Sequence, residues 1–599
     1  MSRFLSFCFV CCCITIHAQS QPNFIFILSD DQSWNGTSVL MDPSQVDSRS
    51  DYYQTPVLEA LAKKGMIFSQ GYASAPKCAP TRISVLTGKS TSRLHFTFTD
   101  NTQEAGTRVL EAKTELVIPD SLTTIAEWIK KQGLNYTTAH YGKWHIQGKG
   151  PAFHGFDRGD GETGNEDGNH DGLVQTDPRN IFSITDSAVA FMSDAVKQAK
   201  PFYVQLSHHA PRSPYEATQK SVDEWKDLLK HPLGKRHKDP SYGAMLQDLD
   251  AGINTLLNKV KELNITENTY IIYIGDNGAG GNNSPLKGGK SSTQEGGIRV
   301  PFFISGPGII ANSYQTTPVV AYDLFPTIAS LATNGSAILP PLLDGISLLP
   351  LLKPQLNLPF NRNQQELVFH CPHFNPNTFP QSAWIDKDYK LLVDYEADKI
   401  QLFDLKKDIS ETTDLSSLLP AKARELTIKL RDYFKKVNTR MPSLNKSYSK
   451  FTGTADDLDK DSLPDTWEFK ELLTTSFIGA DDPDKDGISN WNEWKAQTDP
   501  YISNSTTANR EIQLSFNLFR VLENPFREDI SLEFLNIPKH SNVELLLFDL
   551  QGKQWLRELY SGYETVKRIA SKNLSSGTYL LRVQIIGSNE FQSQLIQKQ

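Results

Sequence analysis

Three short, uninterrupted apolar runs constrain the fold of this chain more than any other feature. They cover residues 24–28, 202–206 and 270–274. Runs of this length are typical of strands that are buried on both faces of a sheet. Between them, residues 121–132 and 187–200 have apolar side chains at helical spacing. This alternation predicts an α/β core up to about residue 340, with a sheet between layers of helices.

The pattern changes after this core. Residues 367–370, 389–393 and 401–405 read as strands separated by polar turns, and a helical pattern follows at residues 421–437. We therefore expect a smaller antiparallel α+β subdomain that packs on the first domain. The expected boundaries are residues 19–360 for the α/β domain and residues 361–442 for the smaller subdomain.

The N-terminus has the features of an export signal. One basic residue, Arg3, precedes an apolar run at residues 4–16, and the small residue Ala18 follows. The run is shorter than the ~20 apolar residues that span a bilayer. We therefore expect a cleaved signal peptide at residues 1–18 and a secreted or cell-surface protein.

Cysteine content and charge limit what the exported chain can be. Four of the six cysteines lie in the expected signal peptide, which leaves Cys78 and Cys371. Two cysteines do not make a disulfide scaffold, although a bridge between them stays open. The net charge of −8 argues against nucleic acid as a partner. Any anionic substrate would need a site that is locally basic.

An acidic stretch at residues 451–505 contains two loops that fit the twelve-residue calcium pattern. They resemble the calcium repeats of bacterial extracellular linkers, so we expect structural Ca²⁺ in loops 457–468 and 482–493. The alternative is a solvated acidic linker, and Ser462 replaces the usual glycine of the first loop. The expected ligands are Asp457, Asp459, Asp461, Asp465 and Glu468, and in the second loop Asp482, Asp484, Asp486, Asn490 and Glu493.

Residues 512–599 form a final β-rich segment that reads as a small all-β sandwich. Its landmarks are Asn524-Pro525-Phe526, the run at 543–548 and the turn at 574–579. The whole segment resembles the C-terminal sorting domain of the type IX secretion system. This resemblance implies that the type IX secretion machinery is a partner and exports the chain.

Carboxylates stand where two of the apolar runs end. Asp30 and Asp31 follow the first run, and Asp276 and Asn277 follow the third. Open α/β sheets bind ligands at the carboxyl ends of their parallel strands. Three carboxylates and an amide oxygen form an oxygen-only ligand set that suits Ca²⁺ and suits zinc poorly.

A second constellation begins at Cys78. Pro80 suits the first turn of a helix, and Arg82 lies one turn after Cys78, so both would face the positive helix end. Such an arrangement can hold a tetrahedral anion. From these residues alone, Cys78 could also be a reactive thiolate or a buried structural cysteine.

The motif around Cys78 resembles the signature of the formylglycine-dependent sulfatases, Cys-x-Pro-x-Arg followed by Leu86-Thr87-Gly88. Residues 142–145, 285–290 and 295–301 match further motifs of that family in order, and the similarity runs from about residue 22 to 440. It implies an alkaline-phosphatase-like sandwich, with a large mixed sheet between helices, and the activity of a sulfuric ester hydrolase.

The resemblance also implies a role for each matching residue. Cys78 would be oxidised to formylglycine by a formylglycine-generating or anaerobic sulfatase-maturing enzyme. His145 would act as a base, while Arg82 and Lys143 would stabilise the reacting groups. Lys290 would bind the sulfate. The metal ligands implied for Ca²⁺ are Asp30, Asp31, Cys78, Asp276 and Asn277.

One segment departs from the family pattern. Where the family often has an Ala-Pro-His-x-Pro segment, Arg212 stands at the histidine position of Ala210-Pro211-Arg212-Ser213-Pro214. Arginine cannot donate a proton at neutral pH. His208 or His209, or another residue, would then protonate the leaving alcohol, and we expect His209 and Arg212 to contact substrate. For His373, substrate contact and a structural role are equally open.

Two other functions compete with a sulfatase. A phosphomonoesterase or phosphonate hydrolase of the same superfamily would share the sheet and the metal positions. A calcium-dependent surface glycan-binding protein would need no catalysis, which the intact Cys78 and His145 argue against. The resemblance favours a sulfated polysaccharide or oligosaccharide as substrate, such as the algal glycans ulvan or carrageenan.

Overall fold

The computed structural model describes residues 21–598 and divides the chain into two compact units, residues up to 504 and residues from 505. The expected signal peptide lies outside the described residues. Residues not described are 1–20, 102–107, 169–175, 228, 361, 363–365, 377, 449–455, 504–518, 523–525, 528, 535–541, 550–552, 562–565, 572–573, 586–590 and 599.

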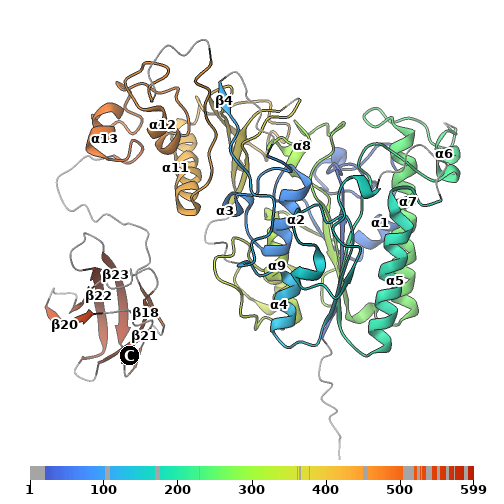
Figure 1. The fold of residues 1–599 in the computed structure, drawn as a ribbon, viewed down its shortest axis with the longest axis horizontal. Helices are drawn as coiled ribbons and strands as arrows, with labels where there is room; N and C mark the ends of the chain where they lie inside the picture. The colour runs from blue at the N-terminus through green and yellow to red at the C-terminus, as the bar shows by residue number, and fades with distance from the viewer. Residues whose placement is uncertain are drawn as a thin grey trace, which may run out of the picture. The chain divides into compact units, whose positions relative to one another are not determined.

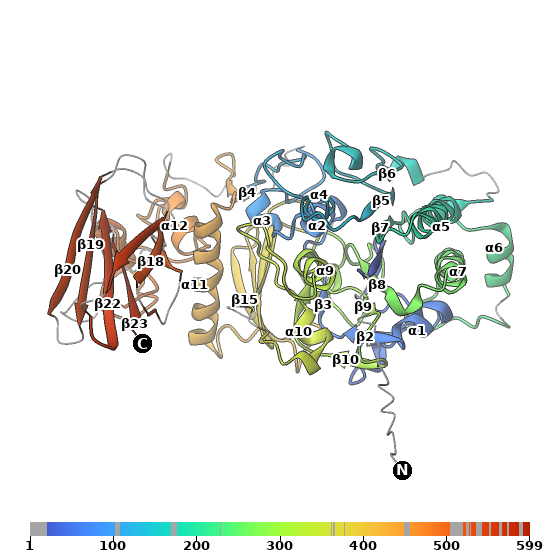
Figure 2. The same cartoon turned by 90° about the horizontal axis from the view of Figure 1, so that it is seen from below.

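The first unit is built on a large mixed sheet with helices beside it (Figure 1). Its eight strands follow the order β10-β2-β9-β8-β1-β7-β5-β6, and most of them are labelled in Figure 2. Antiparallel strand β9 separates β8 from β2, and the other pairs are parallel. The three apolar runs lie in β1, β7 and β8, as predicted. The strands are β1 (Asn23–Ser29), β2 (Gly65–Phe68), β5 (Thr137–Gly142), β6 (Arg158–Gly159), β7 (Phe202–Ser207), β8 (Thr269–Gly275), β9 (Phe302–Ser305) and β10 (Ser313–Gln315).

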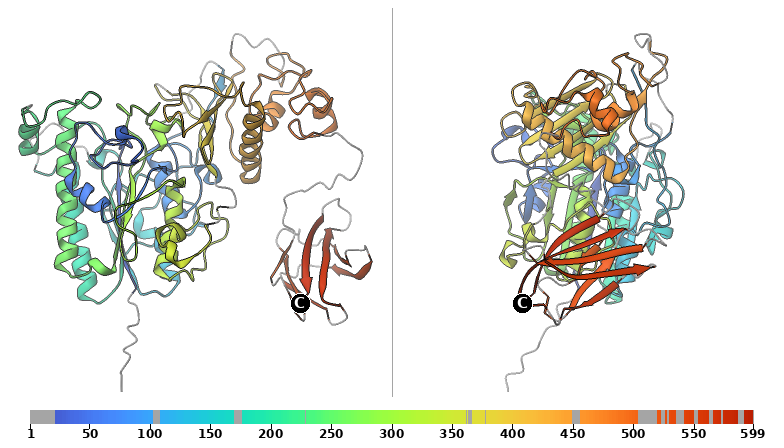
Figure 3. Two further views of the ribbon diagram at one scale, coloured as in Figure 1. Left: turned by 180° about the vertical axis from the view of Figure 1, so that it is seen from behind. Right: turned by 90° about the vertical axis from the view of Figure 1, so that its left-hand side faces the viewer.

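Helices cover both faces of this sheet, which confirms the predicted α/β sandwich (Figures 2 and 3). Strand β1 is buried throughout, with Phe24 and Phe26 in one apolar core and Ile25 and Ile27 in the other. One face carries α1 (Pro56–Ala62), α5 (Ile181–Lys197), α6 (Gln219–Trp225) and α7 (Pro240–Glu262). The other face carries α2 (Cys78–Thr87), α4 (Ile125–Lys131) and α9 (Leu324–Ala332).

A four-stranded antiparallel sheet follows, in the order β12-β13-β14-β15. Its strands are β12 (Glu366–Cys371), β13 (Gln381–Asp386), β14 (Tyr389–Asp394) and β15 (Lys399–Asp404). Helix α11 (Pro420–Val437) packs on it through Leu426 and Leu430. The sequence predicted the helix and three of these strands, but it missed β13. Strand β13 supplies Trp384 to the apolar core that the sheet forms with α11.

Residues 456–503 pack against α11 within the same compact unit. They contain two short helices, α12 (Asp465–Glu471) and α13 (Asn490–Ala496). Leu458, Phe469 and Leu473 belong to the apolar core of the smaller subdomain. The acidic segment that we expected to be a linker therefore contributes side chains to a folded core.

The second unit consists of two antiparallel sheets that share one apolar core. Ile530 and Leu532 come from the first sheet, and Leu545 and Leu581 come from the second. The three-stranded sheet contains β17 (Phe519–Val521), β18 (Asp529–Phe534) and β21 (Val566–Ala570). The four-stranded sheet contains β19 (Asn542–Asp549), β20 (Gln554–Ser561), β22 (Gly577–Ile585) and β23 (Phe591–Lys598). This confirms the expected all-β sandwich.

In the described part of the chain, no helix combines the length and the apolar character needed to cross a membrane.

Candidate active site

The carboxyl ends of β1 and β8 bring four oxygen-bearing side chains together. The two strands pair in parallel and end level, with Ser29 opposite Gly275. Asp30 and Asp276 therefore leave the sheet side by side, and both are fully buried. The backbone N–H of Asp31 donates to Asp276 Oδ1 at 3.0 Å, and the Asn277 amide donates to Asp31 Oδ1 at 2.7 Å.

Helix α2 presents its first residue to this carboxylate cluster. The Cys78 Sγ lies 3.6 Å from Asp31 Oδ1. One atom each from Asp30, Asp31, Cys78 and Asp276 lie within 4.8 Å of one another. Arg82, one turn along the helix, donates to Asp276 Oδ2 at 2.7 Å and to the Lys143 carbonyl oxygen at 2.6 Å.

Two lysines complete a charge-balanced arrangement. Lys143 follows β5, and its Nζ lies 2.6 Å from Asp30 Oδ2; the Lys290 Nζ lies 2.5 Å from Asp31 Oδ2. Burial alone would raise the pKa of Asp30, but the charges of Lys143 and Arg82 hold it well below its usual value. Burial and the neighbouring Asp30 raise the pKa of Asp276 to about 7.

Glycines let the loop that carries Lys290 fold tightly over the strand ends. A Cβ atom at Gly278 would lie 1.8 Å from the Gly296 carbonyl oxygen, and one at Gly297 would lie 2.0 Å from the Ser292 carbonyl oxygen. The Gly278 N–H donates to the Gly297 carbonyl at 2.9 Å. Side chains at these positions would force the backbone apart and move Lys290 away from Asp31.

Burial also disfavours a reactive thiolate at position 78. The thiol is 1% exposed, and burial together with Asp276 and Asp30 raises the pKa of Cys78 to about 12. The thiol is therefore protonated at neutral pH and is a weak nucleophile. Cys78 and Cys371 are both free in the structure, so the bridge that the sequence left open is absent from it.

Three histidines lie around the cluster. Burial, followed by the charges of Lys143 and Arg82, lowers the pKa of His145 to about 2, so its ring is neutral and a weak base in the free site. Burial and Lys143 lower the pKa of His209 to about 3. The His208 pKa is lowered to about 4 by burial, and Asp177 is its charged neighbour. The site charges thus act on His145 and His209.

The segment that carries His209 and Arg212 is anchored by Arg179, a residue that sequence reasoning missed. Arg179 is fully buried, with its Nη2 donating to the Pro214 carbonyl and its Nε 3.4 Å from Glu216. Burial is the main cause that lowers the pKa of Arg179, and the nearby charge of Arg212 adds to it. Arg212 itself is partly buried. No sequence signal distinguishes Arg179 from an exposed arginine.

The donor set fits a hard divalent cation. Its side chains offer carboxylate and amide oxygens, which Ca²⁺ prefers. Among the described residues, Asp30 Oδ1 and Asn277 Oδ1 are buried without a hydrogen-bond partner, and a buried oxygen of this kind is costly unless a ligand satisfies it. A thiol is the one donor that does not suit Ca²⁺.

Residues 22–334 match the family model described as Sulfatase. The chain belongs to the sulfatase family. It is therefore a sulfuric ester hydrolase, and its relatives agree with this assignment.

Several sulfatases and solved structures are similar to this chain. A sulfatase of Formosa agariphila is 26% identical over 514 residues, which cover 70% of this chain and 90% of that protein. The N-acetylgalactosamine-6-sulfatase of Rattus norvegicus is 31% identical over 371 residues, 56% of this chain and 66% of that protein. The crystal structure of Ps i-CgsB in complex with k-i-k-neocarrahexaose has a TM-score of 0.57 and 25% identity, and covers 69% of this chain and 92% of that one.

The C-terminal unit has a separate assignment. Residues 523–598 match a secretion system C-terminal sorting domain. The sulfatase is accordingly exported by type IX secretion to the cell surface or beyond, which confirms the expectation from the sequence.

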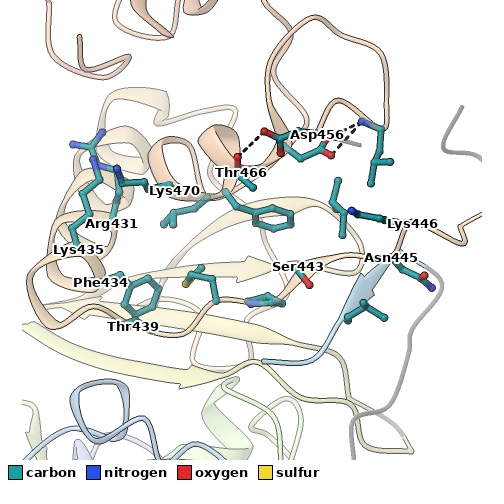
Figure 4. Close-up of a pocket in the computed structure, with 18 of the residues that line it drawn as sticks. Arg431, Phe434, Lys435, Thr439, Ser443, Asn445, Lys446, Asp456, Thr466 and Lys470 are labelled. Atoms are coloured by element: carbon teal, nitrogen blue, oxygen red, sulfur yellow. Dashed lines mark hydrogen bonds between the residues drawn. The ribbon is translucent and has the colours of Figure 1, made fainter. Parts of the chain in front are cut away.

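Two cavities differ in their relation to this site. One of about 410 Å³ is lined by Ser33, Tyr215 and Ala279, from the loops that follow β1, β7 and β8. A larger one of about 710 Å³ lies between α11, α12 and β16 (Ser443–Leu444), as Figure 4 shows. Its described lining includes none of the candidate catalytic residues. The lining of the smaller cavity includes none of them either, but part of it comes from the loops that carry Asp31 and Asp276.

Buried ion pairs join the catalytic domain to the smaller subdomain of the sulfatase. The Lys390 Nζ lies 3.0 Å from Glu295 Oε1 and 2.9 Å from Glu411 Oε1, and all three side chains are fully buried. His373 contacts Thr97 Oγ1 at 2.8 Å and lies 3.4 Å from Glu111. With both of its ring nitrogens near protein groups, His373 has the environment of a structural histidine.

Proposed function

We propose that this sulfatase acts through a formylglycine made from Cys78 and through an active-site Ca²⁺. The environment of Cys78 carries the proposal. A thiol with a pKa raised to about 12 is a weak nucleophile, and it is a poor Ca²⁺ ligand within an oxygen-only cluster. Oxidation to the aldehyde, whose hydrate bears two hydroxyl groups, would replace sulfur with oxygen and resolve both mismatches.

Each group at the site has a chemical task under this proposal. Asp30, Asp31, Asp276 and Asn277 would hold Ca²⁺, which when bound withdraws electrons from the ester and promotes ionisation of a hydroxyl. One hydroxyl of the hydrated residue 78 would attack sulfur while the S–O bond of the ester breaks and the alcohol leaves. Deprotonation of the second hydroxyl would then re-form the aldehyde and break the bond from its carbon to the sulfate oxygen, which releases sulfate.

The side chains around the cluster divide the proton and charge handling. His145, neutral without substrate, would accept the proton of the second hydroxyl once the negative sulfate raises its pKa. Arg82, Lys143 and Lys290 stabilise the negative charge of the sulfate oxygens as the ester bond breaks.

For the leaving-group acid, we propose His209 in preference to His208. The charges of Lys143, Asp30 and Arg82 act on the His209 ring, whereas Asp177 is the charged neighbour of His208. His209 is neutral without substrate, so the negative sulfate would have to raise its pKa before it can donate a proton. Arg212, on the same segment, would contact the sugar or a further anionic group.

We propose a sulfated polysaccharide or oligosaccharide, such as carrageenan or ulvan, as substrate. Type IX export brings the enzyme to external polymers. The cavity of about 410 Å³ is lined by Tyr215, whose partly exposed ring can pack against a sugar face, and by Arg236. The structural neighbour that holds neocarrahexaose supports this substrate class.

The experiment that tests the proposal joins maturation to activity. Protein produced with and without a formylglycine-generating or anaerobic sulfatase-maturing enzyme is digested, and the peptide that contains residue 78 is weighed. Sulfate release from defined sulfated oligosaccharides should rise in proportion to the aldehyde fraction. Full activity in protein that holds only the unmodified cysteine would overturn the proposal.

A further inference from the structure

The acidic segment contains two loops with the same backbone geometry. The N–H of Asp461 donates to Asp457 Oδ1 at 3.2 Å, and the equivalent N–H of Asp486 donates to Asp482 Oδ1 at 3.2 Å. Further along each loop, the N–H of Leu463 and the N–H of Ile488 donate to Asp461 and Asp486, both at 2.8 Å. The sequence repeat is therefore also a structural repeat.

The first loop makes the expected turn although it has serine in place of glycine at position 6. Position 6 adopts a left-handed backbone in both loops, with φ of 82° at Ser462 and 88° at Gly487. Glycine adopts this conformation at least cost, but a serine can be held in it by the surrounding hydrogen bonds. Ser462 thus makes the same turn as Gly487.

Buried carboxylate oxygens of the first loop lack partners. Glu468, at position 12, is 0% exposed, and neither Oε1 nor Oε2 has a hydrogen-bond partner among the described residues. One oxygen each from Glu468, Asp459 and Asp465 lie within 4.8 Å of one another. A fully buried carboxylate beside two others is strongly unfavourable unless a cation compensates the charge.

The second loop has a comparable set of oxygen atoms. Oxygens of Asp482, Asp484 and Asp486 lie within 4.8 Å of one another, and Asp484 Oδ2 is buried without a partner in the described chain. Oxygen-only sets of this charge select Ca²⁺ over transition metals.

The first loop is also fastened to the smaller subdomain. Leu458, inside the loop, packs in the core formed with α11. After the loop, Thr475 donates its N–H to Asp398 Oδ1 at 3.1 Å, and Asp398 pairs with Arg108 at 2.8 Å. Figure 4 shows Asp456 and Thr466 at the edge of the cavity beside α11, joined by a hydrogen bond of 3.1 Å.

We propose that loop 457–468 and its repeat 482–493 each bind one Ca²⁺, and that these ions hold residues 456–503 onto the smaller subdomain of the catalytic unit. The ions act on stability and have no part in sulfate chemistry. Calcium would then support the enzyme through two systems, one at the strand ends and one in the acidic loops. This inference stands independently of the formylglycine mechanism.

Ion counting on the full-length matured chain tests the proposal. After equilibration with Ca²⁺ and desalting, the wild-type protein should hold three ions per chain. Glu468→Gln keeps the shape of the side chain, and should remove one ion and weaken Ca²⁺ binding about 10-fold or more, because site affinity follows ligand charge. The matched control is Glu262→Gln, whose side chain is 67% exposed on α7; it should retain all three ions.

Thermal unfolding measured with and without a chelator gives a readout besides activity. Calcium should raise the unfolding midpoint of the first unit in wild type and in Asp276→Asn, and raise it less in Glu468→Gln. Asp276→Asn should lose hydrolysis while it keeps the loop ions, which separates this inference from the active-site proposal. A wild-type chain with a single ion, or a Glu468→Gln chain with an unchanged response to calcium, would overturn the inference. If Glu468→Gln does not fold, the inference is tested by the number of ions bound to wild type and by the loss of one ion in Asp484→Asn.

Discussion

Each of the three buried carboxylates of the site pairs with a different cation, so the cluster carries no net negative charge before any ion or substrate enters. The pairs are Lys143 with Asp30, Lys290 with Asp31, and Arg82 with Asp276. A divalent cation would give the site a net positive charge, which an incoming sulfate ester can offset. In a buried site such charges act strongly because water does not screen them. The local charge thus overcomes the global net charge of −8.

Replacing His209 tests its role as the leaving-group acid. We expect His209→Ala to lower kcat on a sugar sulfate by about 10²–10⁴-fold, the usual contribution of general acid catalysis. The loss should be much smaller on 4-nitrophenyl sulfate, whose leaving group needs no proton. Steady-state kinetics on both esters measure the difference, with His208→Ala as the comparison. Equal losses on the two esters would assign His209 to binding instead.

Which side chains come together could be predicted from the sequence better than the individual contacts that they make. Parallel strands that end together bring Asp30-Asp31 close to Asp276-Asn277. The helical repeat places Arg82 on the same side of its helix as Cys78. The pairing of individual lysines with individual carboxylates depends on loop paths. Arg179 was missed for the same reason, since its burial depends on the segment around Pro214.

Secondary structure elements bring together side chains that no local pattern connects. β12 places His370 between Ser382 Oγ at 2.7 Å and the Arg440 carbonyl oxygen at 3.0 Å. Strand β13, which supplies Ser382, was missed because residues 381–386 have polar residues at both ends and only a short apolar centre. A strand of this kind is recognised through its two neighbours, not through its own alternation.

The buried His370 should make the first unit less stable in acid. Burial lowers the pKa of His370 to about 3, whereas an unfolded histidine titrates near 6.5. Its stabilising contribution is therefore complete above about pH 6.5 and is lost as pH falls toward 3. At pH 5 the loss is about 2 kcal/mol. The free energy of unfolding should fall between pH 7 and pH 5 in both proteins, and the fall should be smaller by this amount in His370→Gln than in wild type. Denaturant unfolding at the two pH values measures the difference. An identical pH dependence in both proteins would contradict the role of His370 in acid destabilisation.

Over the whole molecule, the acidic segment is where sequence and structure diverge most. Its few apolar side chains are spread among many acidic ones, which is the composition of a solvated linker. Leu458, Phe469 and Leu473 are nevertheless buried in the core of the smaller subdomain, and Arg431 on α11 pairs with Asp499 at 2.6 Å. This burial depends on the partner surface of α11, and local composition does not reveal it.

Two truncations test which residues the catalytic unit needs. A chain that ends at Asn504 should keep kcat/KM, because it loses only the sorting unit. A chain that ends at Pro442 exposes the face of α11 and loses four buried apolar side chains of this core, each worth about 1.5–3 kcal/mol. We expect its unfolding midpoint to fall by about 10 °C or more. Calorimetry measures the unfolding midpoints of the two chains. Equal midpoints would show that the acidic segment is a linker that does not stabilise the smaller subdomain.

Sulfate and phosphate esters of one alcohol, compared on one matured sample, test the central claim most directly. A phosphate monoester carries more negative charge than a sulfate ester, so the cationic site alone would favour phosphate. The proposed release of sulfate needs only deprotonation by His145 and no attack of water at sulfur. We therefore predict a higher kcat/KM for the sulfate ester and no turnover by Cys78→Ser in a host that modifies only cysteine. A higher kcat/KM for the phosphate ester, or full activity in Cys78→Ser, would contradict the account.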